Sequence, residues 1–522
     1  MAAEVLIVGA GPTGLVLAIS LARQGASFRL IDENAGPGTR SRATVVHART
    51  LEFYRHFGFA ADVVAEGIAT ETIHLHERSA SGRSREVMTV GLGELGRGLS
   101  PYPFILTYPQ DLHERLLDRQ LAKLGGRVER STKLVRFRQT DDAILATIRH
   151  PDGGEHEAAF AYVCGCDGAH SAVRQGLGIG FAGGTYDQPF YVADVRLAGR
   201  PDDDFHMNLG KRLLALRMPV RATGMHRLIG LVPPELAGKT DLTFDDLKED
   251  VEDLIGAKVA EVNWFSRYRV HHRVADRFHI GRVFLLGDAG HVHSPVGGQG
   301  MNTGIGDAVN LGWKLGAVAV GNADTGLLDS YEPERIAFAR SLVATTDRVF
   351  TRMIAGGIAG KIVRRFVAPL TGNTAARFAV TRRAAFRTVS QIRIRYGDTP
   401  LSEGKAGKVA AGDRLPWAGD DADNFSEFDG KSWRVHVYGK AEPAFAAGIA
   451  DLTLGLKAFE WSAPVEKAGF KKDAVYVVRP DGHVGYASSG QDCIAVERYL
   501  DRICVRLSGR EIRDPVDQTD RA

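Results

Sequence analysis

The stretch from Val5 to Asp32, VLIVGAGPTGLVLAISLARQGASFRLID, limits the fold more than any other part of the sequence. The apolar run Val5–Val8 predicts a short buried strand, and helical apolar spacing predicts a helix over Leu15–Arg23 that ends at Gly25. A second apolar run, Phe28–Ile31, predicts another strand that stops at Asp32. Strand, turn, helix and strand in this order form the first unit of a doubly wound α/β fold with a parallel sheet.

The turn of this unit carries the pattern Gly9-x-Gly11-x-x-Gly14, which is typical of dinucleotide binding. Gly9 permits the tight turn, Gly11 lets a pyrophosphate approach the backbone N–H groups, and Gly14 lets the helix pack on the strand. Asp32 follows Gly14 at the distance expected of an acid that accepts hydrogen bonds from an adenosine ribose. These residues do not decide between NAD and FAD.

The same stretch is apolar enough to be compared with a signal peptide or membrane span. It lacks a basic leading region, and its glycines interrupt the apolar run, so we expect no targeting or transmembrane segment. The formal charge of +3 gives no reason to expect nucleic acid as a partner. The four cysteines have neither CxxC nor metal-like spacing. We therefore expect neither a disulfide framework nor a metal site, and a cytoplasmic location.

Two later stretches repeat the strand-turn-helix logic. One is AYVCGCDGAHSAVRQGLGI from Ala161, with Asp167 after its strand and Ser171 and Arg174 on its helix. The other is GRVFLLGDAGHVHSPVGGQGMNTGIGDAVNLGWKL, with a strand over Val283–Leu286, a Gly287-Asp288 corner and a helix over Asp307–Leu315. With GAGPTG, DGAHSAVR and this second stretch, the sequence resembles the single-component FAD-dependent aromatic hydroxylases of the para-hydroxybenzoate hydroxylase and phenol hydroxylase type.

This resemblance implies a non-covalently bound FAD and a set of residues that hold it. An acid near the ribityl hydroxyls and a bare loop along the isoalloxazine edge suit the cofactor, since a Cβ would keep backbone N–H groups away from N1 and O2. Asp288 suits the first role. The full cofactor-binding set is Gly9, Gly11, Gly14, Asp32, Arg42, Gln110, Asp167, Gly287, Asp288, Pro295, Gly298, Gly300, Met301 and Asn302. Arg49 suits a flavin contact and an exposed surface charge equally well.

His291 and His293 lie in the same stretch. A histidine pair on a loop without cysteine or acidic partners in ligand register is more often a packing or hydrogen-bonding element than a metal site. The resemblance places the two histidines near the flavin pyrophosphate, and we predict no metal.

The resemblance also implies the reaction. NADPH or NADH binds transiently, reduces FAD and leaves, and oxygen then forms a flavin C4a-hydroperoxide that hydroxylates a phenolic or other electron-rich aromatic substrate. A second GxGxxG, at Gly91, Gly93 and Gly96, lacks a following helix and strand, so we interpret it as a loop and expect no second dinucleotide domain. A flavin-dependent dehydrogenase or epoxidase, or a non-catalytic flavin-containing scaffold, remains an alternative.

The predicted fold is a Rossmann-type FAD-binding domain with an inserted β-sheet substrate domain, a helical segment and a C-terminal thioredoxin-like domain. We place the FAD-binding domain at 1–72, 109–180 and 270–340, the substrate domain at 73–108 and 181–269, the helical segment and linker at 341–400, and the last domain, which lacks CxxC, at 401–522. The candidates for contact with the substrate hydroxyl are His47, Tyr191, His206 and His226, although each suits an ordinary wall or surface position as well. No catalytic base can be named.

The last third of the chain carries less information. Residues 335–395 hold thirteen Lys or Arg and one acid, Asp347, a composition that favours solvated helix faces or a subunit contact, such as a homodimer, over a membrane surface. Gly and Pro residues at 397–417 predict a linker. The runs SWRVHVYG and AVYVVRPDGHVGYA predict strands, and a helix is expected from Cys493.

Overall fold

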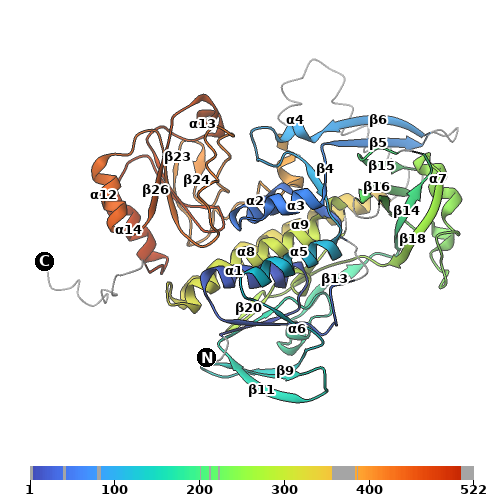
Figure 1. The fold of residues 1–522 in the computed structure, drawn as a ribbon, viewed down its shortest axis with the longest axis horizontal. Helices are drawn as coiled ribbons and strands as arrows, with labels where there is room; N and C mark the ends of the chain where they lie inside the picture. The colour runs from blue at the N-terminus through green and yellow to red at the C-terminus, as the bar shows by residue number, and fades with distance from the viewer. Residues whose placement is uncertain are drawn as a thin grey trace.

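The computed structural model describes residues 4–38, 43–78, 84–199, 201–210, 213–220, 224–294, 296–354, 383–384 and 386–506, apart from the side chains of residues 296 and 349–354. Figure 1 shows three parts: a central α/β domain that includes the N-terminus, a sheet on one side of it, and a smaller C-terminal domain on the other side.

The central domain is built on a six-stranded sheet of buried strands. Its order is β20 (His279–Ile280), β21 (Val283–Leu285), β12 (Tyr162–Gly165), β1 (Val5–Val8), β2 (Phe28–Ile31) and β8 (Val128–Glu129). β1 pairs in parallel with β2 and β12, and β12 pairs in parallel with β21. The predicted strands Val5–Val8 and Phe28–Ile31 are confirmed with the same bounds, and so is the parallel sheet.

Helices α1 (Pro12–Gln24), α5 (Gln110–Lys123) and α8 (Gln299–Ala319) lie together against this sheet (Figure 1). α1 ends at Gly25 in the left-handed conformation, with φ of 80°. α1 and α8 approach closely, because a Cβ added to Gly312 of α8 would lie 2.4 Å from Ser20 Oγ of α1. Most of α8 is buried, and the buried residues include the polar side chains Asn302, Asp307, Asn310 and Lys314.

Smaller elements complete the domain. They are β3 (Val45–Val46), α2 (Ala48–His56), α3 (Ala60–Glu66), β4 (Ile68–Thr70), β7 (Ile105–Thr107), β9 (Lys133–Gln139), β10 (Ile144–Arg149), β11 (Glu155–Phe160), α6 (Ala172–Gly176), β13 (Phe181–Thr185), β19 (His271–Ala275), β22 (His291–Val292) and α9 (Tyr331–Ile354). Short 3-10 turns lie at Pro234–Leu236, Gly287–Ala289, Val296–Gly298 and Thr325–Ser330.

Two sequence-based interpretations of local structure are wrong. The helix predicted over Asp307–Leu315 begins at Gln299, so Met301 and Asn302 are helical. The segment between Gly91 and Gly96 is not a loop, because α4 (Leu92–Gly96) follows directly on β6 (Ser84–Gly91). Both segments are rich in glycine, which has a low helix propensity, so the sequence did not predict helices there. In the folded protein, packing on neighbouring groups outweighs that low propensity.

The side sheet has seven strands. Its order is β18 (Val259–Tyr268), β14 (Phe190–Leu197), β17 (Met225–Leu231), β16 (Leu214–Val220), β15 (Phe205–Leu209), β5 (Thr72–Arg78) and β6. Its two faces bury different clusters. Phe190, Val192, Ile229 and Leu231 share a cluster with Val45 of the central domain, whereas Tyr191, Ala193 and Leu228 pack with Leu247 and Val251 on the side of α7 (Lys248–Ile255). We call these the inner and outer faces.

The C-terminal domain contains a six-stranded mixed sheet. Its order is β24 (Val409–Ala410), β23 (Glu403–Ala406), β28 (Val484–Ser488), β27 (Val475–Val478), β25 (Arg434–Tyr438) and β26 (Gly455–Phe459), with helices α12 (Pro443–Asp451), α13 (Ala463–Ala468) and α14 (Cys493–Arg502). Both predicted strand runs and the helix from Cys493 are confirmed. The likeness of this domain to thioredoxin stays a prediction.

The linker predicted at 397–417 is wrong. β23 pairs in parallel with β28, and Leu401, Leu415 and Trp417 are buried. Glycine and proline serve here as turns of a small hairpin that packs on the C-terminal sheet. Residues 355–382 and 385 of the basic stretch at 335–395 lie outside the described residues.

Within the described residues, no helix is long and apolar enough to cross a membrane. All four cysteines carry free thiols.

Candidate functional site

The turn after β1 shows three glycines with three different surroundings. A Cβ at Gly9 would lie 2.4 Å from the Cys166 carbonyl oxygen, and one at Gly14 would lie 1.9 Å from the Gly9 carbonyl oxygen. A Cβ at Gly11 would meet nothing within 4 Å. The packing of the chain therefore requires Gly9 and Gly14, whereas Gly11 faces open space at the position where a pyrophosphate approaches.

The helix after this turn leaves its first N–H groups without a side-chain cap. The N-cap of α1 is Gly11, and no side chain accepts a hydrogen bond there. Uncapped N–H groups and the helix dipole together favour an anion at this end. Asp32, at the end of β2, accepts hydrogen bonds from the Ala10 N–H at 2.7 Å, from the Asn34 N–H at 2.8 Å and from Asn34 Nδ2 at 2.9 Å. A carboxylate has about four acceptor positions, so Asp32 keeps capacity for a ribose hydroxyl.

The corner after β21 presents Asp288 to the surface. Gly287 adopts a φ of 58°, and its N–H donates to Asp307 Oδ2 at 2.9 Å. This contact holds the corner while Asp288 points outward and is exposed. Asp167 follows β12, and its Oδ2 accepts from the Val173 N–H at 3.1 Å. Burial raises the pKa of Asp167.

The glycine segment before α8 is held close to the central domain. Gly298 is the N-cap of α8 with φ of 62°, and a Cβ there would lie 2.7 Å from Val45 Cβ. No side chain caps α8, so the N–H groups around Gly300 and Met301 have no intrahelical partner. The positive end of a 21-residue helix therefore points at a bare backbone, which suits the negative edge of a reduced flavin.

Asn302 fixes this segment to the strand beside it. Its Oδ1 accepts from the His47 N–H at 2.9 Å and from Thr50 Oγ1 at 2.8 Å, and its Nδ2 donates to the carbonyls of Val45 and Gly298. The side chain of Asn302 therefore positions the loop, although the sequence favoured it as a flavin contact.

His47 lies against the same loop. Its Nε2–H donates to the Gly297 carbonyl at 2.8 Å, and burial lowers the pKa of its imidazole to about 4, although the hydrogen bond opposes that shift. The ring is therefore neutral near pH 7, and Nδ1 carries the lone pair. Nδ1 is buried and has no hydrogen-bond partner among the described residues. The same holds for His293 Nε2 and Ser294 Oγ.

The two histidines of this stretch make hydrogen bonds. His291 Nε2 lies 2.7 Å from Asp307 Oδ2, and His293 Nδ1 lies 2.9 Å from the Ser294 carbonyl. No cluster that could hold a metal ion occurs among the residues that the structure describes.

Of four further predicted residues, the structure describes Gln110 and Arg49. Arg42 and Pro295 lie outside the described residues. Gln110 begins α5, where its N–H donates to the Ala43 carbonyl and its Nε2 donates to Glu114 at 2.8 Å. Arg49 is not an exposed charge, because it is buried and binds Glu52 at 3.0 Å and the Asp481 carbonyl of the C-terminal domain at 2.7 Å.

The three substrate candidates on the side sheet lie on its outer face. Tyr191 lies in the outer cluster with Phe244 and Leu247, and its buried hydroxyl has no partner among the described residues. His206 and His226 are also on the outer face, where they bind Asp202 at 2.7 Å and 3.2 Å. The sequence could not reveal this, since both faces of the sheet are buried and the strands do not alternate in polarity.

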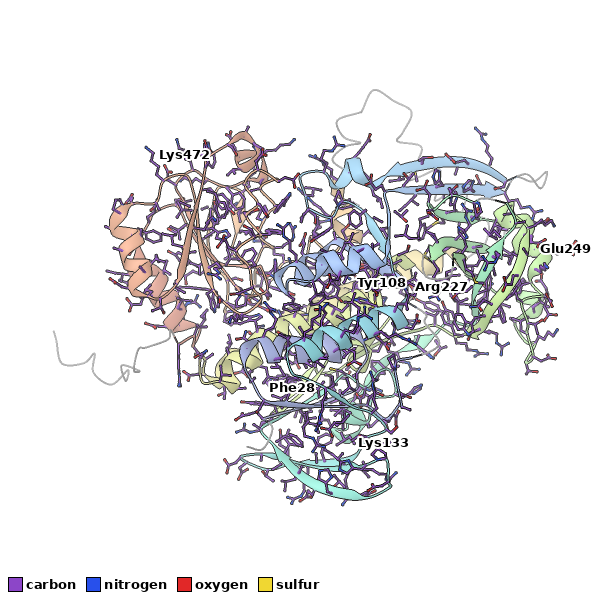
Figure 2. The ribbon with its side chains drawn as sticks, viewed as in Figure 1. Phe28, Tyr108, Lys133, Arg227, Glu249 and Lys472 are labelled. Carbon is purple, nitrogen blue, oxygen red and sulfur yellow. The ribbon has the colours of Figure 1, made fainter. Side chains whose placement is uncertain are left out.

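The sequence analysis missed a polar pair on the inner face. Arg227 binds both carboxylate oxygens of Asp194 at 2.7 Å and donates to Thr44 Oγ1 at 2.8 Å. Figure 2 shows Arg227 on the side of the sheet toward the central domain, whereas Glu249 of α7 lies at the far side. The sequence signal that could have revealed this pair is an Asp on β14 and an Arg on β17, which lie opposite each other on neighbouring strands.

A buried ionic network connects this site with the C-terminal domain. Arg479 binds Glu334 at 2.6 Å and Asp481 at 2.6 Å, and Lys314 binds Glu334 at 2.7 Å. The next residue, Arg335, binds Asp307 at 2.6 Å. Burial would raise the pKa of Glu334, but the nearby cations outweigh it and lower that pKa to about 2. The carboxylates stay charged, and the C-terminal domain supports the residues behind the Gly287 corner.

The open approach at Gly11, the two uncapped helix ends and the unpartnered polar atoms beside the glycine segment all fit FAD. A family model described as an FAD binding domain matches residues 2–346. The chain belongs to this family of FAD-dependent aromatic monooxygenases.

Relatives and solved structures agree with this membership. A flavin-dependent monooxygenase of Mycobacteroides abscessus is 31% identical over 96% of this chain and 99% of its own length. A pentachlorophenol 4-monooxygenase of Sphingobium chlorophenolicum is 32% identical over 79% of this chain and 75% of its own length. OxyS, an anhydrotetracycline hydroxylase of Streptomyces rimosus, has a TM-score of 0.73 and 28% identity over 96% of this chain and 99% of its own. The protein is an FAD-dependent enzyme.

Proposed function

We propose that this enzyme uses NAD(P)H and molecular oxygen to hydroxylate a phenolic or other electron-rich aromatic compound held between the inner face of the side sheet and the glycine segment before α8. When bound, FAD supplies the hydride acceptance and the oxygen activation that the reaction needs. The chain supplies binding, orientation and exclusion of water.

One observation carries this proposal. Apart from the Arg227–Asp194 pair, the inner face of the side sheet is apolar, and Val45, which belongs to its cluster, also contacts Gly298 of the glycine segment. The partly buried side chains Met207, Leu216 and Trp264 extend that face. An aromatic ring placed there would lie beside the flavin edge in a dry, apolar setting, which protects a reactive oxygen species from water.

His47 is the residue best placed to recognise a substrate hydroxyl. Its neutral ring is oriented by the Gly297 carbonyl, and its free Nδ1 lone pair can accept a hydrogen bond from a phenolic O–H. We assign it a positioning role. Removal of His47 should raise the KM for the phenol more than it lowers the rate of flavin reduction.

The experiment is a comparison of NADPH oxidation with and without a panel of phenols, together with the mass of the product. A monooxygenase consumes NADPH faster when its substrate is present and yields a product heavier by one oxygen atom. A dehydrogenase turns its substrate over without oxygen, and a non-catalytic scaffold does neither. Substrate turnover in the absence of oxygen would refute the proposal.

The relatives support an aromatic substrate, because their names include a chlorinated phenol and several tetracycline precursors as compounds on which they act. The proposed substrate class for this chain is therefore an electron-rich aromatic compound.

A further inference from the structure

A basic pocket lies where the C-terminal domain meets the central domain, and the reaction described above does not use it. Its volume is about 640 Å³, within the range of small-ligand sites. Figure 1 shows α4 and α13 on the facing sides of the two parts, and both contribute to the lining, α4 through the adjoining Arg97.

Seven cationic side chains line this pocket: Arg414 and a group of six, which are Arg97, Arg383, Arg387, Arg393, Lys408 and Lys467. The structure gives none of the six an ion pair with a described residue. The chain at 355–382, next to Arg383 in sequence, contains no Asp or Glu.

The other charged groups of the lining are already paired. Asp413 binds Arg395 at 3.1 Å, and Arg414 binds Glu52 at 2.8 Å. The pocket therefore carries a large positive charge without an internal counter-charge. Burial and the guanidinium groups of Arg383, Arg414 and Arg393 lower the pKa of Arg387, which shows how closely these charges gather. Like charges placed together destabilise a fold unless an anion binds among them.

The pocket adjoins the flavin side of the enzyme through one short segment. Arg387, Ile392 and Arg393 line the pocket, while Val389 and Gln391 contact Gln299 beside the glycine segment. The Val389 carbonyl accepts from Gln299 Nε2 at 2.8 Å, and Gln391 Nε2 donates to Gln299 Oε1 at 2.6 Å. Gln299 is the first residue of α8, so a ligand in the pocket lies one layer of chain away from the flavin loop.

We propose that this pocket binds the phosphate groups of the electron donor and that the donor is therefore NADPH in preference to NADH. This inference rests on the proposed function for the identity of the ligand, but the charge of the pocket is independent of that function. Arginine binds phosphate in a bidentate manner, and the additional phosphate of NADPH gives the six cations a further partner. An uncharged or singly charged phenol does not use such a site.

The test is calorimetric binding of NADP⁺ to the FAD-loaded oxidised enzyme, which needs no turnover. The pocket variant is R387Q/R393Q. The control variant is R115Q/R498Q, which removes the same charge at two exposed arginines outside the pocket. FAD content and thermal midpoint, measured for all three proteins, confirm that each is folded.

We expect the pocket variant to bind NADP⁺ at least about tenfold more weakly than wild type, since each lost arginine contact to a phosphate is worth about one order of magnitude. The control should bind as wild type does. Wild-type affinity should fall as salt rises, and NAD⁺ should bind more weakly than NADP⁺.

Equal NADP⁺ affinity in the pocket variant and wild type would overturn the inference, and so would NAD⁺ binding as tightly as NADP⁺. Inorganic pyrophosphate that binds the pocket as tightly as NADP⁺ would overturn the dinucleotide assignment. If NADPH fails to reduce the wild-type flavin while NADP⁺ still binds in a pocket-dependent manner, the proposed function fails and the binding site stands.

Discussion

Replacement of Arg479 by Met tests whether the C-terminal domain supports the flavin site. Arg479 is fully buried and neutralises Asp481 and Glu334, while Lys314 also neutralises Glu334. Two cations and two carboxylates balance in this cluster. R479M leaves Asp481 buried without a cation, although Trp313 Nε1 still lies 3.3 Å from it.

Loss of one partner from a buried ion pair costs about 3–5 kcal/mol, because the remaining charge is desolvated and uncompensated. We expect a fall of that size in the free energy of unfolding and an earlier release of FAD on heating, since Glu334 and Arg335 are consecutive and Arg335 holds Asp307. FAD fluorescence during thermal and urea unfolding measures both.

The matched control is R479M/D481L, which removes one cation and one carboxylate together and keeps the Lys314–Glu334 pair. Apolar replacement of a whole buried pair is often neutral, so the double variant should recover most of the loss. If R479M is as stable as wild type to within about 0.5 kcal/mol, or if the double variant is no better than R479M, the network does not have the structural role assigned to it.

Three further predictions concern the site and its stability. D288A should weaken FAD retention about tenfold, because the carboxylate proposed to bind the ribityl hydroxyls is lost, and unchanged FAD affinity would remove Asp288 from the site. L216A on the inner face should raise hydrogen peroxide release per NADPH consumed, since a loose ring slows oxygen transfer more than flavin reduction. H206A on the outer face should not raise hydrogen peroxide release. Equal peroxide release by both variants would contradict the assignment of the substrate to the inner face. Burial lowers the pKa of His113 and His436 to about 3 in the folded protein from the ordinary 6.5. The unfolded chain therefore binds more protons below pH 6.5, so stability should be complete above that pH and fall progressively on acidification toward pH 3. A thermal midpoint that does not change between pH 7 and pH 5 would contradict this.

The sequence predicted those parts of the fold in which a local residue pattern is compatible with only one local structure. The strands Val5–Val8 and Phe28–Ile31 and the close packing at Gly9 and Gly14 follow from apolar runs and from the need for close backbone approach. The candidate flavin residues at Gly298 and Asp288 lie on the elements expected from the same reasoning.

Contacts between distant segments could not be predicted in this way. Arg49 and Asp481 are more than 400 residues apart, and no local pattern indicates that they meet. The face on which the substrate candidates lie could not be predicted for a different reason. All seven residues of β17 are buried, so the pattern of polar and apolar residues does not distinguish its two faces. Alternate residues of a strand lie on opposite faces, and only the packing of the sheet shows that Arg227 lies on the inner face and His226 on the outer face.

We propose that this enzyme transfers an atom of molecular oxygen to an aromatic substrate. Turnover of a phenol identified by the NADPH assay, under isotopically heavy oxygen gas in ordinary water and followed by mass spectrometry of the product, tests this transfer. We predict that the product carries one heavy oxygen atom for each molecule of NADPH consumed in coupled turnover. A product whose added oxygen comes from water, or an oxidised product that has gained no oxygen, would contradict it.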